Sequence, residues 1–163
     1  MMAPKSLLRH RRCVSALKHM AEESSFHRIL WDDEDSLFNS NGNLVEDKQI
    51  KRVIFCSWKI YYELIEEREK REIKDIYILR IEQLYPFPYK ALNNELKRFP
   101  TAELIWCQEE PRNMGAWTFV IEPMQTIFKQ LGREKEQLVF VGRPALLHLQ
   151  LVWCQDILQN KLL

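Results

Sequence analysis

The sequence predicts an α/β protein, a three-layer sandwich in which helices cover both faces of a mostly parallel sheet. From residue 51 onward, short apolar runs alternate with amphipathic segments of helical spacing. The runs are almost continuously apolar, which is typical of strands buried on both faces. Two of them, 76–81 and 102–107, continue into similar Glu/Gln- and Pro-containing breaks before the next helix. Strands in series with helices between them form parallel sheets through right-handed crossovers.

The first fifty residues predict little regular structure. Residues 4–20 place apolar side chains among basic ones, which indicates a loose helical or extended arm. Residues 26–31 alternate in part between apolar and polar, which predicts a short strand. Residues 39–43 (Asn-Ser-Asn-Gly-Asn) predict a turn, because Asn and Gly tolerate positive φ.

From residue 51 the predicted elements follow one another closely. Strands are predicted at 53–57, 76–81, 102–107 and 138–142. Helices are predicted at 59–74, 91–99 and 116–131, because apolar side chains recur there at helical spacing. In the last helix Pro123 predicts a kink or a start, and Gly132 predicts the end.

Composition and charge place the chain among globular proteins. Its 163 residues suit one domain with a core, and 46% of them are apolar and 29% charged. The net charge of +1 provides no overall basic field, so nucleic-acid binding is disfavoured. The basic stretch in the first twenty residues and the acidic cluster 32–35 are interpreted as solvated surface.

The cysteines and apolar runs indicate a reducing compartment. Cys13, Cys56, Cys107 and Cys154 are far apart and form no C-x-x-C pair, so a zinc site is not predicted. The sequence carries no recognisable signal peptide and no apolar run of membrane-spanning length. We therefore expect a cytoplasmic protein.

Ligands of parallel sheets bind beyond the carboxyl ends of the strands. The polar residues predicted there are Ser57-Trp58-Lys59, Glu82-Gln83, Gln108-Glu109-Glu110 and Arg143. Glu109 and Glu110 are candidates for a general acid/base pair. A surface turn in which one Glu caps the following helix is the favoured interpretation, because adjacent residues of an extended stretch point opposite ways.

Other catalytic and cofactor patterns are weak. The four histidines have no partner at a recognisable motif spacing, although a Cys–His nucleophile pair stays open. No phosphate-binding glycine motif is present, and neither is the Gly-Asp-Gly…Asn-Asn signature for thiamine diphosphate. We therefore predict no catalytic, cofactor-binding or metal residues in this chain.

Five motifs together resemble a known family. They are Pro4-Lys5-Ser6-Leu7-Leu8-Arg9, Ser57-x-Lys59-x-Tyr61-Tyr62, the run Arg80–Pro88, the run Gln108–Trp117 (Gln-Glu-Glu-Pro-x-Asn-Met-Gly-Ala-Trp), and Val141-Gly142-Arg143-Pro144. In this order they resemble the carboxyl-terminal domain of 2-oxoglutarate dehydrogenase, first (decarboxylating) component. The resemblance covers about residues 1–145 and implies a transketolase carboxyl-terminal-domain-like fold.

The resemblance implies an activity that belongs to the intact enzyme. That enzyme is a homodimer that depends on thiamine diphosphate and Mg²⁺, and it passes a succinyl group from 2-oxoglutarate to the lipoyl group of a succinyltransferase component. We expect residues 1–50 to be an arm leading in from a missing pyrimidine-binding domain, 51–145 the α/β domain, and 146–163 a divergent tail. The expected location is the bacterial cytoplasm, or the mitochondrial matrix of a eukaryote. Alone, the chain is predicted to have no decarboxylase activity.

The resemblance also implies two surfaces. The first is an interface with the pyrimidine domain and in the dimer, formed by the following residues: Gln108, Glu109, Glu110, Arg112, Asn113, Met114 and Trp117. The second is an allosteric acetyl-CoA site, for which Gln83 and Lys90 match the family in kind. Ser25, Arg28 and Ala91 depart from it and remove cationic partners, which argues against that site.

Two further departures concern the integrity of the chain. Trp58 stands where the family has Gly at a strand-to-helix turn, which would cost about 1–3 kcal/mol if its φ is positive. The tail after residue 145 differs from the family tail, but codons can be chosen for residues 146–159 that encode a family-like tail in a shifted frame. A frameshift near residue 145 is the resulting hypothesis. The alternatives left open are a separately encoded part of an active enzyme, a decayed gene remnant, and an acetyl-CoA-responsive regulatory module.

Overall fold

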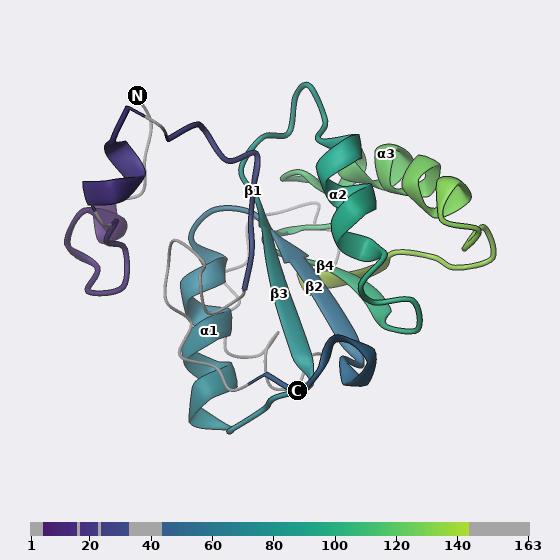
Figure 1. Cartoon of the computed structure of the whole chain (residues 1–163), viewed down its shortest axis with the longest axis horizontal. Coiled ribbons are helices and arrows are strands. Elements are labelled where there is room, and N and C mark those ends of the chain that lie inside the picture. The colour runs from purple at the N-terminus through teal and green to yellow at the C-terminus, as the bar shows by residue number, and fades with distance from the viewer. Residues whose placement is uncertain (1–4, 16, 23, 33–43, 144–163) are drawn as a thin grey trace.

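A five-stranded sheet forms the centre of the molecule. The computed structural model describes residues 5–15, 17–22, 24–32 and 44–143. Its strands are β1 (Ile29–Leu30), β2 (Arg52–Cys56), β3 (Ile76–Ile81), β4 (Glu103–Pro111) and β5 (Val139–Arg143). They lie in the order β1-β3-β2-β4-β5, and all pairs are parallel except β1 with β3. The mostly parallel sheet predicted from the sequence is confirmed (Figure 1).

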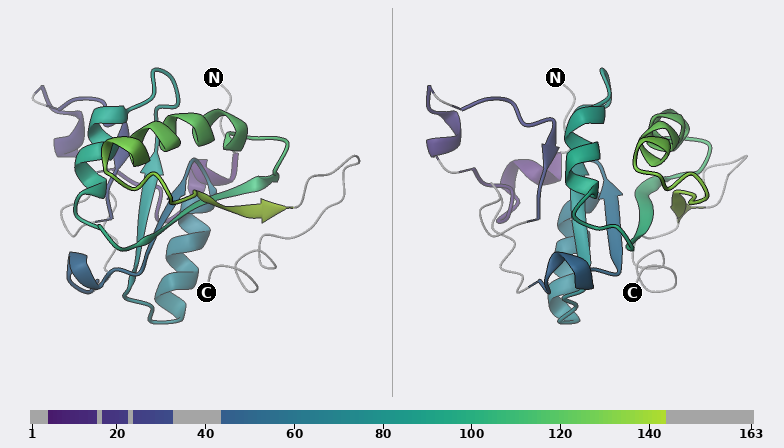
Figure 2. Two further views of the ribbon diagram at one scale, coloured as in Figure 1. Left: turned by 90° about the vertical axis from the view of Figure 1, so that its right-hand side faces the viewer. Right: turned by 45° about the vertical axis from the view of Figure 1, so that its right-hand side comes forward.

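Three helices cover the two faces of this sheet. They are α1 (Ile60–Lys70), α2 (Tyr89–Leu96) and α3 (Trp117–Gln130). Side chains from α1 pack on one face of the strands, and side chains from α2 and α3 pack on the other. Figure 1 shows α1 on one side of the strands and α2 and α3 on the other, and the left view of Figure 2 looks onto the sheet from the side of α2 and α3. The three-layer sandwich is therefore confirmed.

The alternation of side chains along β2 explains why its sequence is apolar throughout. Val53 and Phe55 join the core beneath α2 and α3, whereas Ile54 and Cys56 join the core beneath α1. Neighbouring residues of a strand point to opposite faces, so a strand covered twice needs apolar side chains at every position. Burial of its thiol also raises the pKa of Cys56.

The helices end differently from the sequence prediction. The helix predicted to reach residue 74 stops at Lys70, because Glu72 takes a positive φ of 55° and the amide of Ile73 bonds to the carbonyl of Arg68. The next helix is shifted toward the N-terminus, to Tyr89–Leu96 instead of 91–99. Pro123 lies inside α3 and does not mark its start. Gly132, at φ 71°, follows the end of α3 as predicted.

The strand predicted at 102–107 is longer than expected. It continues to Pro111, although residues 108–111 were predicted to form a turn. The reason is its neighbour: Pro111 lies in register with Arg143 of β5, and the amide of Arg112 bonds to the Arg143 carbonyl at 3.2 Å. An irregularity between Cys107 and Pro111 absorbs the change in register, and Pro111 tolerates this position because it needs no amide partner.

The segment before residue 51 contributes to the sheet. The short strand predicted within 26–31 is present as β1, and Ile29 and Leu30 lie opposite Ile81 and Arg80. The described residues of this segment also form short 3₁₀ helices at Lys5–Arg9, Leu17–Met20 and Asp47–Gln49. The arm contacts α1 through Arg12, whose guanidinium bonds both carboxylate oxygens of Glu69 at 2.6 and 2.9 Å. The turn predicted at 39–43 and the tail 146–163 lie outside the described residues.

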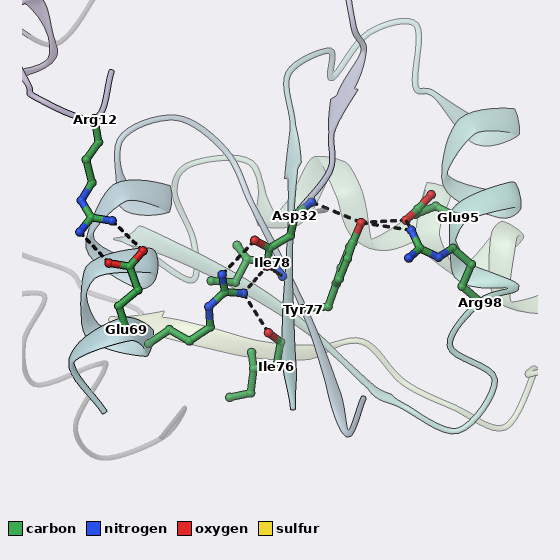
Figure 3. A network of polar contacts seen from close by, with 9 residues as sticks. Arg12, Asp32, Glu69, Ile76, Tyr77, Ile78, Glu95 and Arg98 are labelled. Carbon is green, nitrogen blue, oxygen red and sulfur yellow. Dashed lines mark hydrogen bonds and ion pairs between the residues drawn. The ribbon is translucent and has the colours of Figure 1, made fainter. Parts of the chain in front are cut away.

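Asp32 corrects the prediction that the acidic cluster is solvated. Its carboxylate is fully buried and forms a bidentate ion pair with Arg68 of α1, whose own side chain is 2% exposed. The amide of Ile78 donates to the same carboxylate at 2.8 Å, and Arg68 also donates to the carbonyl of Ile76. Figure 3 shows Asp32 against β3, beside Tyr77. A buried carboxylate is tolerated because all of these partners compensate its lost hydration.

Candidate functional site at the carboxyl ends of β2 and β4

The candidate site lies where two neighbouring strands send the chain in opposite directions. β2 and β4 are adjacent, and the chain leaves β2 through α1 on one face but leaves β4 through α3 on the other. Such a divergence opens a crevice beyond the carboxyl ends of the strands. A pocket of about 720 Å³ occupies this position. Its lining residues are Ser57, Trp58, Lys59, Ile60, Leu84, Tyr85, Glu109, Glu110, Gly115, Ala116 and Phe119.

Three of the predicted strand ends meet in this pocket. The segment after β2 supplies Trp58 and Lys59, the loop after β3 supplies Leu84 and Tyr85, and the end of β4 supplies the two glutamates. Arg143, at the end of β5, is not among the lining residues but donates from Nε to the carbonyl of Glu109 at 2.6 Å. Glu82, Gln83 and Gln108, which the sequence also places at strand ends, are not among the lining residues, and a functional role of the strand ends stays a prediction.

Trp58 adopts the strained conformation that the sequence raised as a possibility. Its φ is 66°, in the left-handed region that residues other than glycine rarely enter. Such a residue costs about 1–3 kcal/mol when nothing local compensates it. The side chain is 58% exposed, so its own burial recovers only part of this cost.

Lys59 ties the end of β2 to the end of β4. Its ammonium lies 2.7 Å from an oxygen of Glu109 and 3.0 Å from an oxygen of Glu63 on α1. The hydrogen bond to Glu109 raises the pKa of Lys59, and the bond to Glu63 adds to the effect. Lys59 is therefore a charged bridge across the crevice that stays protonated through the neutral range.

Gln108 organises the turn that follows β4. Its side-chain oxygen accepts hydrogen bonds from Trp106 Nε1 at 2.8 Å and from the amide of Trp117 at 3.0 Å. Its side-chain nitrogen donates to the carbonyls of Met114 and Pro111, at 2.7 and 3.1 Å. Because Gln108 is 3% exposed, these bonds are made away from bulk water. One amide thus joins the strand, the turn and the first residue of α3.

Gly115 is required by this arrangement. Its φ is 65°, and a Cβ at this position would lie 2.9 Å from Gln108 Nε2 and 3.0 Å from a Glu110 carboxylate oxygen. A side chain here would displace the amide that holds the turn. The glycine therefore serves both the backbone conformation and the close approach of Gln108.

The residues predicted to form an interface divide into three groups by their exposure. Glu110, Arg112, Asn113 and Met114 are exposed along the turn, and Met114 is 51% exposed. Glu109 is half-buried beside Lys59. Gln108 and Trp117 are buried, so Trp117 offers no exposed apolar area beside Met114. Trp117 instead packs against Phe140, with Arg112 above both rings.

The residues predicted for acetyl-CoA lie on a different loop. Gln83 follows β3 and donates from its side chain to the carbonyl of Pro86 at 2.6 Å. Lys90 lies exposed in the first turn of α2. The assignment of these two residues to acetyl-CoA stays a prediction.

The surface turn with a capping Glu, which the sequence favoured, is wrong: Glu109 and Glu110 lie in β4, and the N-cap residue of α3 is Ala116, with no side-chain cap hydrogen bond. The two carboxylates are separated, as predicted for neighbours in an extended stretch: Glu109 contacts Lys59, and Glu110 is exposed. Among the described residues no three His, Cys, Asp or Glu side chains group as a metal site would require. Over the same residues, none of the helices has the length and apolar character needed to cross a membrane.

Several residues of the pocket and of the buried ion pair were not singled out from the sequence. Phe119 and Tyr85 line the pocket because α3 and the loop after β3 converge there, which depends on the strand order. Arg68 had a readable signal: it follows Leu64 by four residues and Ile65 by three, which places it on the apolar face of α1. A charged residue at such a position predicts a buried partner, although not that the partner is Asp32.

The chain matches proteins of known family along most of its length. Residues 14–148 match the family described as 2-oxoglutarate dehydrogenase C-terminal. A 2-oxoglutarate dehydrogenase E1 component of Brucella anthropi is 54% identical over 145 residues, which is 89% of this chain and 14% of that relative. The proteins of the same name from Brucella ovis and Brucella canis are 53% identical over the same extent. The chain thus spans about a seventh of the length of these curated relatives.

Proposed function

Since the chain belongs to the family of the 2-oxoglutarate dehydrogenase carboxyl-terminal domain, we propose that it is a structural, interface-forming domain of the decarboxylating first component. In this proposal the chain does not carry out the reaction by itself. It docks to the part of the enzyme that carries thiamine diphosphate and Mg²⁺, and it supports the dimer that this part forms. The complete assembly converts 2-oxoglutarate and a lipoyl group to a succinyl-dihydrolipoyl group and carbon dioxide, in the cytoplasm of a bacterium.

The turn held by Gln108 is the observation that supports docking. Glu110, Arg112, Asn113 and Met114 protrude from it, and Met114 offers apolar area beside charged groups. Met and Arg are enriched in protein interfaces, where an apolar centre is surrounded by a polar rim. Because Gln108 fixes the turn from inside, little conformational entropy is lost on binding.

The donor set of the pocket does not fit a diphosphate bound through a metal ion. Lys59 is already paired with Glu63 and Glu109, and Glu110 adds another negative charge at the rim. The described residues contain no group of three His, Cys, Asp or Glu side chains that could hold the metal ion, and without a metal ion two phosphates would meet these carboxylates with Lys59 already paired. We therefore derive no step of the reaction in this chain and place the cofactor in the partner part of the enzyme.

Co-purification tests the proposal. The chain would be expressed with the portion of the Brucella anthropi relative that precedes the matched region. We expect the two to co-purify and, with added thiamine diphosphate and Mg²⁺, to release carbon dioxide from 2-oxoglutarate. Met114→Asp should weaken the association. Glu134→Gln changes an exposed residue after α3 and is the control, which should leave the association unchanged. Separate elution of the two proteins at high concentration would contradict docking.

The strain at Trp58 favours a second candidate, a decayed gene remnant. A residue at φ 66° with a mostly exposed side chain is a defect for folding unless it contributes to binding. The genomic DNA on both sides of the reading frame distinguishes the two. A neighbouring frame for the upstream domains supports a separately encoded subunit. A family-like tail in another frame near residue 145, without such a neighbour, supports a remnant.

A further inference from the structure

Large aromatic side chains gather around the pocket without being buried. Trp58 follows β2, Tyr85 lies in the loop after β3 and Phe119 lies in the first turn of α3, and they are 58%, 83% and 46% exposed. Their convergence on one concave surface is unusual, because scattered exposure of single apolar residues is what a monomeric surface normally shows. Trp and Tyr are also the side chains that contribute most often to the energy of an interface.

The charges of the pocket are unbalanced. Lys59 is neutralised by Glu63 and Glu109. The carboxylate of Glu110 has no ion-pair partner among the described residues. The nearest basic residue along the turn, Arg112, lies over the rings of Trp117 and Phe140. A negative group beside exposed aromatic faces attracts a cation, both directly and through the ring quadrupoles.

We infer that the pocket receives a basic side chain, Arg or Lys, flanked by apolar residues of a polypeptide partner. The cationic head would pair with Glu110 and lie against Trp58 or Tyr85, and the apolar neighbours would cover Phe119. This inference rests on the proposed docking function, since it names the chemistry of the segment that docks. An anionic occupant would instead meet Glu109 and Glu110 with the one lining ammonium already paired.

Continuity with the proposed interface favours a polypeptide over a small molecule. Glu109 and Glu110 at the end of β4 line the pocket together with Gly115, and the turn that carries Met114 follows directly on β4. A segment that covers the turn therefore reaches the pocket without crossing another surface. The matched relatives extend far beyond the region that this chain represents.

Titration with capped tripeptides tests the inference directly. The ¹⁵N-labelled chain would be titrated with acetyl-Leu-Arg-Leu-amide while the indole N–H signals are followed, with the Trp58 signal assigned from Trp58→Phe. We expect that signal to shift in a saturable way. Acetyl-Leu-Glu-Leu-amide should bind at least about tenfold more weakly, because it places a carboxylate against Glu110.

Two variants and one control assign the binding to the pocket. Glu110→Gln should weaken the Arg peptide about threefold to tenfold, as expected for a partly exposed ion pair. Trp58→Gly should weaken it by a similar factor while the fold becomes more stable, so unfolding cannot explain the loss. Glu134→Gln removes an exposed carboxylate elsewhere and should leave the affinity unchanged.

Each other outcome overturns the inference. Equal affinity for the Glu peptide, or no shift at the highest soluble peptide concentration, removes the cation preference. Equal affinity for methylguanidinium alone points to a small-molecule site instead of a polypeptide one. Because the titration needs no partner protein, its failure leaves the co-purification result standing, and failed co-purification leaves the peptide result standing.

Discussion

The two Pro-containing runs that follow β3 and β4 look alike in sequence but fold differently. β3 ends at Ile81, and Gln83 lies partly exposed in the loop that follows. The hydrogen bond described for its side chain goes to the carbonyl of Pro86. After β4 the strand continues to Pro111, and Gln108 is buried with bonds to two tryptophans and the turn.

The difference comes from the neighbouring strand. β4 runs beside β5, whose Arg143 pairs with Pro111, whereas β3 has β1 beside it only at Arg80 and Ile81. The neighbouring strand at the edge of the sheet therefore determines which of these two Glu/Gln- and Pro-containing segments is a loop and which is an extended strand. The same short motif carries a structural glutamine in one place and an exposed one in the other.

Replacing Gln108 should give the largest effect on this comparison. Gln108→Ala leaves Trp106 Nε1, the amide of Trp117 and two carbonyls without their partner, so we expect a loss of about 2–4 kcal/mol in the free energy of unfolding. Urea denaturation followed by circular dichroism measures it. A loss as small as that of Gln83→Ala would show that the two runs are equivalent after all.

Trp58 follows β2, which lies between β3 and β4 in the sheet. Its replacement should change the free energy of unfolding in the opposite direction to that of Gln108. Trp58→Gly should stabilise the fold by about 1 kcal/mol, because relief of the positive φ outweighs the greater chain entropy of glycine. Trp58→Ala is the matched control: it removes the ring but keeps the Cβ, and it should gain less. Equal gains would assign the effect to the ring and not to the backbone. Thermal and urea unfolding of the three proteins provide the measurement.

The two runs should also differ in how pH changes their contribution to stability, because Lys59 pairs with the run after β4. Lys59→Met should cost about 0.5–1 kcal/mol at neutral pH, a modest value because the pair is about a third exposed. Since the folded state raises the pKa of Lys59, the contribution is complete below the ordinary lysine value of about 10.4 and disappears as the pH rises further. The gap between wild type and variant should therefore close at alkaline pH. In contrast, the run after β3 holds Glu82 by Arg80, a guanidinium that does not titrate in this range.

Gln83→Ala should have the smallest effect, below about 0.5 kcal/mol, since its side chain is partly exposed and bonds to its own loop. The same variant tests the acetyl-CoA prediction. Calorimetry with acetyl-CoA should show weaker binding for Gln83→Ala than for the wild type if the site is retained. Heat of binding that is identical for the two proteins would remove Gln83 from any such site.

The sequence predicted elements where one local pattern determines the outcome. The apolar strands and the Gly132 helix end follow from residue type and spacing, and the structure has them. The predictions were wrong where the outcome depends on a distant segment. The end of β4 depends on β5 beside Pro111, and the burial of Asp32 depends on Arg68. The conditional expectation at Trp58 succeeded because backbone conformation at a strand-to-helix turn is a local property.

The pocket lies at the carboxyl ends of the strands, where this fold class places ligands, but several of its lining residues were not singled out from the sequence. Parallel strands bring their carboxyl ends together, which follows from the fold class alone. The convergence of Tyr85, Phe119 and Trp58 also requires the strand order, because only the adjacency of β2 and β4 opens the crevice between them. The burial of Trp117 likewise follows from α3 packing over β5, where it meets Phe140.

The carboxylate of Asp32 has a consequence for self-association. It accepts the amide of Ile78, just beyond the short pairing of β1 with β3, and so occupies a backbone donor that an edge strand would otherwise present. A two-residue strand followed by a buried charge is a means of ending a sheet without inviting another chain to add to it. A chain shortened past Asp32 would leave apolar β3 as an unpaired edge strand. It would also leave the buried charge of Arg68 without its carboxylate. We expect such a chain to aggregate.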